Sequence, residues 1–270
     1  MNKSGIVIAG IKGRMGKLIA QEAAKQHTLI GGTVRDKDPA NGKDLLSIGL
    51  GNFGNGPIHS NLDTLLQDIQ EQARKDNVVV IDFTAPEAML PHLEIAIKHK
   101  TPMVIGTTGL NAEHRAAIEA TSQHIPILYA ANTSLGANLL HWITQKVAHA
   151  MPDADVEIME IHHQHKKDAP SGTATWLAQG ICEAGERGPM IFNRNDHGER
   201  APKEVGISAL RGGDVPGEHT AYFFLEGERI EISHRAQNRY IFAQGAVAAA
   251  SYLLKQSPGQ YTMNDVLGLS

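Results

Sequence analysis

The chain has 270 residues, 41% hydrophobic and 20% charged, which is the composition of a folded protein and a length that favours two domains. The formal net charge of −4 gives no electrostatic support for a nucleic-acid partner. A single cysteine, Cys182, excludes an internal disulfide and fits a reducing compartment. Since no apolar run is long enough for a signal peptide or a membrane span, we expect a cytoplasmic protein with no membrane partner.

Short apolar runs alternate with helical patterns through the first half of the chain. The predicted strands are 5–9, 29–34, 77–83, 103–105 and 125–129. The predicted helices are 17–26, 86–98 and 111–123, and residues 47–56 are expected to form a loop. Apolar strands separated by helices imply a parallel sheet that is covered on both faces.

The pattern changes after about Asn132. A long helix is expected at 135–151, and a half-buried strand of apolar and acidic residues at 156–161. Further strands at 204–211 and 220–236, the latter folded back at 226–228, indicate a mixed or antiparallel sheet. The alanine-rich helix at 242–254 is not assigned to either half by its composition.

A glycine-rich turn joins the first predicted strand to the first predicted helix. Glycines let backbone N–H groups approach a pyrophosphate, and the helix N-terminus adds partial positive charge. The spacing is GxxGxxG instead of GxGxxG, so a plain turn stays an alternative, whereas a Walker-type loop is excluded because no Gly-Lys-Ser/Thr follows. The candidate cofactor residues here are Gly10, Ile11, Lys12, Gly13, Arg14 and Met15.

Arg35 and Asp36 follow the second predicted strand, where dinucleotide-binding domains contact the adenosine ribose. An acid at this place binds the ribose hydroxyls, whereas an arginine accommodates the 2′-phosphate of NADPH. Because Arg35 and Lys37 can both bind a phosphate, we expect NADPH as the cofactor, with NADH as the alternative. A solvated charge run at a strand end is the alternative.

Three histidines and a lysine surround the end of the strand at 156–161. The strand is expected to end near His162, so the basic residues that follow it lie on a loop. Lys166, His162 and His163 are the candidate cationic or switchable hydrogen-bond donors. Zinc binding by the histidines is one alternative, but adjacent His162 and His163 point to opposite faces of an extended chain, and the lysines repel a cation. A solvated basic loop is the other alternative.

A further helix is expected to begin at Ser171 or Thr173, directly after Pro170. Exposed N–H groups at Gly172 and Thr173 would form an anion site that favours a carboxylate. We therefore expect a carboxylate-bearing substrate beside a proton donor.

Six motifs occur along nearly the whole chain: GxxGRMG at 10–16, DFT at 82–84, GTTG at 106–109, AANxS at 130–134, ExHHxHKxDAPSGTA at 160–174 and RxGDxxGEHT at 211–220. In these motifs the chain resembles the dihydrodipicolinate reductase family of the diaminopimelate route to lysine. The resemblance implies NAD(P)H-dependent reduction of 4-hydroxy-tetrahydrodipicolinate, or of its dehydrated dihydrodipicolinate form, to tetrahydrodipicolinate.

The resemblance also implies residue roles. His162 would be the active-site histidine and Lys166 the proton donor. The substrate carboxylates would be held by His163, Lys166, Gly172 and Thr173, with Ser171 close by. Besides the glycine turn, the cofactor would contact Gly106, Thr107, Thr108, Ala130, Ala131, Asn132 and Thr133. No metal site is implied.

The implied fold is an α/β Rossmann-type dinucleotide-binding domain, residues 1–131 and 241–270, with an inserted α+β domain at 132–240 for substrate binding and oligomerisation. The family resemblance further implies a homotetramer. The chain departs from the family in two places. Arg35 precedes Asp36 where an acid followed by arginine is common, and Thr133 replaces a common phenylalanine.

Two functions from other classes stay open. A metal-dependent hydrolase would use His162, His163 and His165, and stoichiometric zinc would favour it. A nucleotide sensor without catalysis would bind the cofactor but show no dicarboxylate-dependent oxidation. The intact segment at 160–174 favours the reductase.

Overall fold

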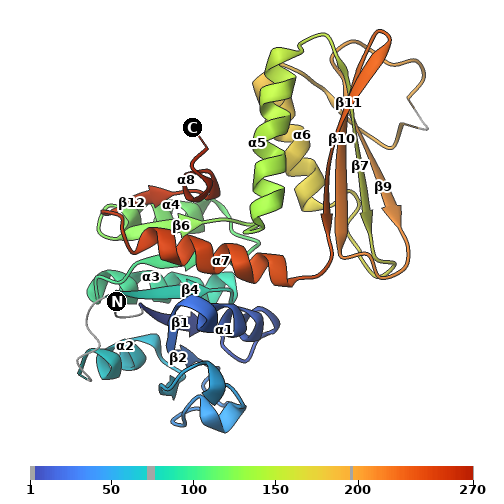
Figure 1. The fold of residues 1–270 in the computed structure, drawn as a ribbon. Helices are drawn as coiled ribbons and strands as arrows, with labels where there is room; N and C mark the ends of the chain where they lie inside the picture. Colours follow the sequence, from blue (N-terminus) through green and yellow to red (C-terminus); the bar gives the residue numbers. More distant parts are fainter. Residues whose placement is uncertain (1–3, 72–76, 195–196, 270) are drawn as a thin grey trace. The chain divides into compact units, whose positions relative to one another are not determined.

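The computed structural model describes residues 4–71, 77–194 and 197–269, which form two compact units (Figure 1). The first unit spans Met1–Ser134 and Phe242–Ser270, and the second spans Leu135–Ile241. The second unit is therefore one continuous insertion into the first. The expected boundaries at 131/132 and 240/241 lie close to these limits, and the roles assigned to the two domains stay predictions.

A parallel sheet forms the centre of the first unit. Its strands are β1 (Gly5–Ala9), β2 (Thr28–Thr33), β3 (Ile58–His59), β4 (Val78–Asp82), β5 (Met103–Ile105), β6 (Pro126–Tyr129) and β12 (Gly259–Tyr261). Within the described residues the sheet has seven strands in the order β12-β6-β5-β4-β1-β2-β3, and every neighbouring pair is parallel. The strand order reverses between β1 and β4, which is where such sheets bind ligands at their carboxyl ends.

Helices cover both faces of this sheet. They are α1 (Arg14–Gln26), α2 (Leu62–Glu71), α3 (Pro86–Lys98), α4 (Ala112–Ser122), α7 (Tyr240–Leu253) and the short α8 (Met263–Leu267). Apolar residues of α2, α3 and α4 pack with Val7 and Val80 in one buried cluster. Figure 1 shows α1 and α7 on the other side of the strands. The predicted α/β class is confirmed, and α7 completes the first unit.

Four elements of the first unit were not predicted. Strands β3 and β12 are too short to show a periodicity. Helix α2, however, carries Leu62, Leu65, Leu66 and Ile69 at helical spacing, a signal that the sequence analysis missed. Helix α8 was also missed, and the predicted loop at 47–56 contains two 3₁₀ turns, Leu46–Ile48 and Gly51–Phe53.

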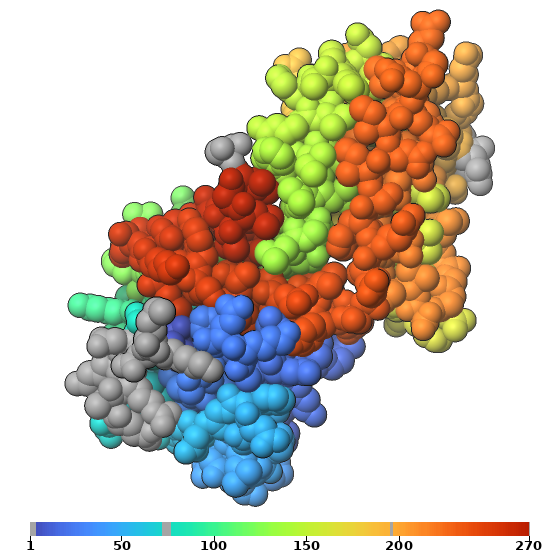
Figure 2. All heavy atoms as spheres, viewed as in Figure 1, coloured from blue at the N-terminus to red at the C-terminus, as the bar shows by residue number. Residues whose placement is uncertain are grey.

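The second unit is a mixed sheet covered by two helices. Its strands are β7 (Asp155–His162), β8 (Met190–Phe192), β9 (Val205–Arg211), β10 (Gly217–Leu225) and β11 (Glu228–Ala236), and its helices are α5 (Leu135–Ala150) and α6 (Gly172–Gly185). The described residues give the order β11-β10-β7-β9-β8, in which β10 is antiparallel to β7 and β11 and the other pairs are parallel. Both helices pack on one face of the sheet, and Figure 2 shows α5 beside β11. The predicted α+β class is confirmed.

Strand β7 carries a charge on its helix-facing side. The residues that alternate onto this buried face are Val156, Ile158, Glu160 and His162. Glu157 lies on the other face and is half-buried, as expected for an acidic position of a half-buried strand. Glu160 is an acid at a position in phase with Val156 and Ile158, so the unbroken alternation of β7 buries it completely. No helix in the described parts of the chain is long and apolar enough to cross a membrane.

The packing of α2 predicts a stability difference between two leucines of the first unit. Leu65 is completely buried, whereas Leu46 is 73% exposed. We expect Leu65→Ala to reduce the free energy of unfolding by about 2–5 kcal/mol, and Leu46→Ala to change it by less than about 0.5 kcal/mol. Urea unfolding followed by circular dichroism measures both variants. Equal losses for the two would contradict the packing described here.

Candidate functional site

The glycine turn after β1 presents backbone to solvent at the start of α1. Gly10 adopts a positive φ of 74°, and a Cβ at Gly16 would lie 2.5 Å from the Gly10 carbonyl oxygen. Gly13 is the N-cap of α1 and offers no side-chain cap, and the first turn contains no acid. These features fit a diphosphate, because the helix N-terminus is left for an anion instead of a side chain.

A cavity of about 680 Å³ adjoins this turn. Its lining comes from the carboxyl ends of β1, β2 and β4 and from α3. From the predicted cofactor residues it includes Gly10, Lys12, Gly13, Arg35 and Asp36. The structure therefore brings the glycine turn and the segment of Arg35 and Asp36, predicted to contact the ribose, to one cavity large enough for part of a dinucleotide.

Lys12 makes an ion pair that the sequence did not suggest. Its Nζ lies 2.7 and 2.9 Å from the two carboxylate oxygens of Asp38. The hydrogen bond from Lys12 lowers the pKa of Asp38. Asp38 lines the same cavity together with Arg35 and Asp36, so positive and negative groups face this part of the cavity.

Asp82 connects the DFT and GTTG motifs. This buried carboxylate at the end of β4 accepts hydrogen bonds from the backbone N–H and hydroxyl of Thr84, at 2.8 and 2.5 Å, and from the Thr107 hydroxyl at 3.1 Å. The Nδ1 atom of His92, on α3, lies 2.7 Å from its other oxygen. Thr84 and His92 line the cavity, so Asp82 links the GTTG turn to it.

Among the other predicted cofactor residues, Arg14 and Met15 begin α1, and the rest lie on the turns that follow β1, β5 and β6. Thr108 and Ala131 are exposed, whereas Ile11 and Gly106 are buried. Thr133 is 1% exposed, and its hydroxyl donates to the Phe242 carbonyl at 2.8 Å. Its side chain therefore packs against α7, and only its backbone is left to contact a ligand. The binding roles of Gly106, Thr107, Thr108, Ala130, Ala131, Asn132 and Thr133 stay predictions.

In the second unit, the loop after β7 holds the predicted basic residues. His162 is 8% exposed, His163 is half-buried, and the Nζ of Lys166 lies 2.8 Å from an Asp168 oxygen. This pairing with Lys166 lowers the pKa of Asp168. The rings of His163 and His165 are 6.3 Å apart, and no group of three metal-ligating side chains occurs among the described residues.

Helix α6 begins immediately after this loop. Ser171 is its N-cap, and the Ser171 hydroxyl accepts a hydrogen bond from the Ala174 N–H at 3.2 Å. Gly172 and Thr173 occupy the first turn of the helix. The predicted helix start is confirmed at this place. Its role in binding an anion stays a prediction.

Glu160 joins the loop to the helix. Its Oε2 accepts from His162 Nδ1 at 2.6 Å, and its Oε1 accepts from the Ser171 N–H at 2.9 Å. Arg211, on β9, donates to both oxygens at 2.8 Å and also to the Asp168 carbonyl at 2.6 Å. Burial alone would raise the pKa of Glu160, but hydrogen bonds from His162, Arg211 and Ser171 outweigh it and lower the pKa to about 2.

His219 completes the cluster from β10. It is 5% exposed, shares a hydrogen bond of 3.0 Å with the Ser171 hydroxyl, and packs edge-on against His162 at 5.3 Å. Burial, followed by the charge of His162, lowers the pKa of His219 to about 4. Glu160, Arg211 and His219 were given no role from the sequence, although all three lie in the quoted motifs. A signal for Glu160 was available, since a charged residue interrupts the alternation of β7.

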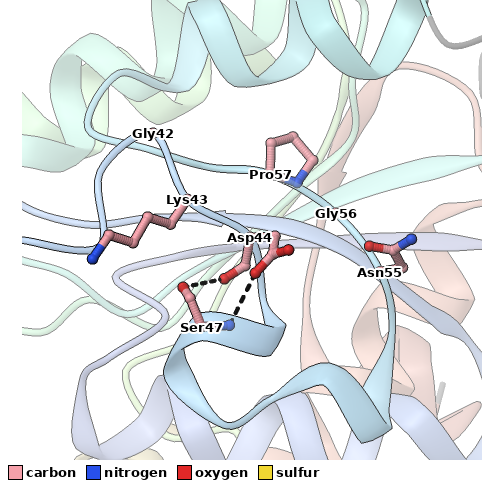
Figure 3. Close-up of a pocket in the computed structure, with 7 residues that line it drawn as sticks. All are labelled: Gly42, Lys43, Asp44, Ser47, Asn55, Gly56 and Pro57. Carbon is pink, nitrogen blue, oxygen red and sulfur yellow. Dashed lines mark hydrogen bonds between the residues drawn. The ribbon is translucent and has the colours of Figure 1, made fainter.

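A separate cavity of about 590 Å³ is lined by the segment that connects β2 to β3 (Figure 3). Its lining residues are Gly42, Lys43, Asp44, Ser47, Asn55, Gly56 and Pro57. Ser47 donates from its hydroxyl to the Asp44 carbonyl at 2.6 Å and from its N–H to the Asp44 side chain at 2.9 Å. None of the lining residues belongs to the predicted cofactor or substrate set, so this cavity is outside the candidate site.

The buried His219 predicts a pH-dependent stability. The unfolded chain takes up a proton near pH 6.5, whereas the folded chain excludes it until about pH 4. The free energy of unfolding should therefore fall by up to about 1.4 kcal/mol per pH unit below pH 6.5. His219→Gln should remove this contribution in urea unfolding between pH 4 and 7. Burial also lowers the pKa of His141 to about 4, so His141 contributes the same pH dependence of stability to the unmodified protein and to His219→Gln. If the free energy of unfolding changed with pH equally in both proteins, the expectation would be contradicted.

Comparisons with known proteins agree with the motifs. A family model described as Dihydrodipicolinate reductase, N-terminus, matches residues 4–133, and one described as Dihydrodipicolinate reductase, C-terminus, matches residues 136–267. Two relatives named 4-hydroxy-tetrahydrodipicolinate reductase, from Syntrophus aciditrophicus and Magnetococcus marinus, are 43% and 41% identical to this chain. Each alignment covers 97% of both proteins.

A solved structure shares the fold. A dipicolinate-bound dihydrodipicolinate reductase from Paenisporosarcina sp. TG-14 matches with a TM-score of 0.76 and 24% identity, over 97% of this chain and 98% of that chain. The family models together cover both units from end to end. The chain therefore belongs to the dihydrodipicolinate reductase family of oxidoreductases.

Proposed function

We propose that the protein reduces 4-hydroxy-tetrahydrodipicolinate, or its dehydrated form, to tetrahydrodipicolinate with NAD(P)H, in the diaminopimelate route to lysine. One observation carries the proposal. The buried carboxylate of Glu160 accepts hydrogen bonds from His162 at the end of β7 and from Ser171 at the start of α6. This arrangement holds the His162 imidazole close to the N-terminus of α6. A helix N-terminus favours a carboxylate and an imidazole can transfer a proton, so the pair suits a substrate with a carboxylate next to the atom that is protonated.

The first unit is the proposed dinucleotide site. The uncapped start of α1 would hold the pyrophosphate, and Arg35 and Asp36 would face the adenosine ribose. When bound, the reduced nicotinamide supplies the hydride. The rest of the chemistry depends on what the chain provides: a fixed position for the substrate, charge to offset its carboxylates, and a proton.

The second unit is the proposed substrate site. His163, Lys166 and the N–H groups of Gly172 and Thr173 would bind the ring carboxylates. A substrate carboxylate would compete with Asp168 for the Lys166 ammonium, because both are anions and Asp168 is exposed. Lys166 or His162 would then protonate C3 of the ring after hydride reaches C4. Two further parts of the proposal are a homotetramer, which rests on the family resemblance, and a cytoplasmic location, for which the single cysteine is the support.

Removal of the Lys166 ammonium should affect turnover more than cofactor binding. We expect Lys166→Ala to lower kcat by at least about 100-fold, since general acid assistance typically contributes about 10²–10⁴-fold. The affinity for NADPH should be nearly unchanged, because Lys166 lies in the second unit and the proposed cofactor residues in the first. Steady-state oxidation of NADPH with freshly prepared 4-hydroxy-tetrahydrodipicolinate as substrate measures kcat, and titration with NADPH measures the affinity.

Lys167→Ala is the matched control for this experiment. Lys167 is the neighbouring lysine in the same loop and is exposed, so its loss changes the charge of the loop by the same amount. Its kcat should stay within about twofold of the unmodified enzyme, as is usual for exposed substitutions without a specific contact. Equal effects of the two substitutions would remove Lys166 from the proposed role.

Arg35 should set the preference for NADPH. A charge-assisted hydrogen bond to the 2′-phosphate contributes about 1.5–3 kcal/mol, so Arg35→Ala should weaken NADPH binding by about 10- to 150-fold. NADH lacks this phosphate and should bind almost as before. Titration of both cofactors into both proteins gives the ratio of dissociation constants. An unchanged ratio would show that Arg35 does not recognise the phosphate.

A further inference from the structure

We propose that Glu160 is a positioning residue that fixes His162 as the tautomer protonated on Nδ1 and holds Ser171 at the start of α6. One side chain would then set the geometry of both halves of the substrate site. The inference rests on the proposed function for its consequence in catalysis, but the tautomer itself can be tested without substrate.

The strand geometry explains why Glu160 reaches both partners. Glu160 and His162 lie two residues apart on β7, so both side chains project from the same face. In the sheet, His219 of β10 lies directly opposite Glu160, and Arg211 of β9 lies directly opposite His162. The carboxylate is thus surrounded by partners from its own strand and from both neighbouring strands, in addition to the start of α6.

The contacts of the carboxylate determine which imidazole nitrogen carries the proton. An ionised carboxylate is only an acceptor, and hydrogen bonds from His162, Arg211 and Ser171 keep the pKa of Glu160 near 2. His162 Nδ1, at 2.6 Å, must therefore be the donor. In the neutral ring the other nitrogen, Nε2, then lacks a proton and is the atom that exchanges one.

The ring of His162 is also restrained from the side opposite Glu160. A Cβ at Gly217 would lie 2.8 Å from His162 Nε2, so the backbone of β10 passes close to this nitrogen. His219 packs edge-on against the ring. No hydrogen bond to Nε2 comes from any residue in the described part of the chain, so this nitrogen is left for a ligand or solvent.

The charges that face His162 come from several elements. Glu160 contributes a negative charge from β7, and Arg211 of β9 a positive charge that offsets it. His219 of β10 is kept neutral at pH 7 by its lowered pKa. Lys166 belongs to the loop after β7 and is paired with Asp168. Among these groups, the Nδ1 contact with Glu160 is the one that selects the tautomer.

The second contact of Glu160 concerns the anion site. Its bond to the Ser171 N–H holds the residue that caps α6, and the first-turn N–H groups of Gly172 and Thr173 follow directly. Arg211 binds the Asp168 carbonyl and so anchors the loop between His162 and Ser171. The distance from the histidine to the helix start is thus maintained through Glu160 instead of through the exposed loop alone.

The first test uses the unmodified enzyme and needs no substrate. With histidine labelled by ¹⁵N, the ring nitrogens of His162 can be assigned by the loss of their signals in His162→Gln. At a pH where the ring is neutral, we expect a proton on Nδ1 and none on Nε2. A proton on Nε2 instead would overturn the proposal, whether or not any variant of Glu160 folds.

The second test removes the charge of Glu160 and keeps its shape. Glu160→Gln can donate as well as accept, so His162 should populate both tautomers in the same NMR measurement. The kcat should fall at least about tenfold, since tautomer selection by a buried carboxylate can contribute up to about 10⁴-fold.

Glu157→Gln is the matched control. It removes the same charge from the same strand but on the opposite face, where Glu157 contacts Arg194. It should leave both the His162 tautomer and kcat unchanged. If Glu160→Gln also leaves both unchanged, or if Glu157→Gln shifts them equally, Glu160 has no positioning role. If the unmodified enzyme shows the expected tautomer but no reductase activity, the proposed function fails while the assignment of Glu160 stands.

Discussion

Desolvation of one carboxylate governs the organisation of the second unit around its candidate site. Glu160 occupies a strand face that it shares with Val156 and Ile158, where an unpartnered charge would be strongly unfavourable. The charge is tolerated because both of its oxygens have donors from three sides. The end of β7, the start of α6 and the side chain of Arg211 must therefore reach their places together. The contacts that stabilise this part of the fold are therefore the same contacts that position the residues of the candidate site.

The first unit applies the same principle at a different sheet. Asp82 is also fully buried at the carboxyl end of a strand, and it also accepts from a histidine Nδ1 and a nearby backbone N–H. The two units differ in what they present to a ligand. The first offers mainly backbone, because glycines at 10, 13 and 16 leave no side chains over the start of α1. The second offers cationic and imidazole side chains on a loop clamped by Arg211.

The sequence predicted the elements that have a long or distinctive pattern. The strand at 103–105 and the helix at 86–98 have the observed bounds, and the motif at 160–174 identified the loop and helix start at the site. Short strands such as β3 and β8 have too few residues for a period to be recognised. The partners of Glu160 could not be derived either, because the register that places His219 opposite Glu160 depends on contacts between distant segments.

The insertion of the second unit has a consequence for the order in which the protein can fold during synthesis. Helix α7 and strand β12 belong to the first unit but are translated last, and His27 bonds to Ser251 across 224 positions of the chain. The parallel sheet thus lacks its edge strand and one covering helix until almost the whole polypeptide has left the ribosome. The inserted unit, being continuous, has all its residues available earlier. Nascent chains stalled before residue 240 would expose the uncovered face of that sheet, a state in which chaperones would be expected to bind.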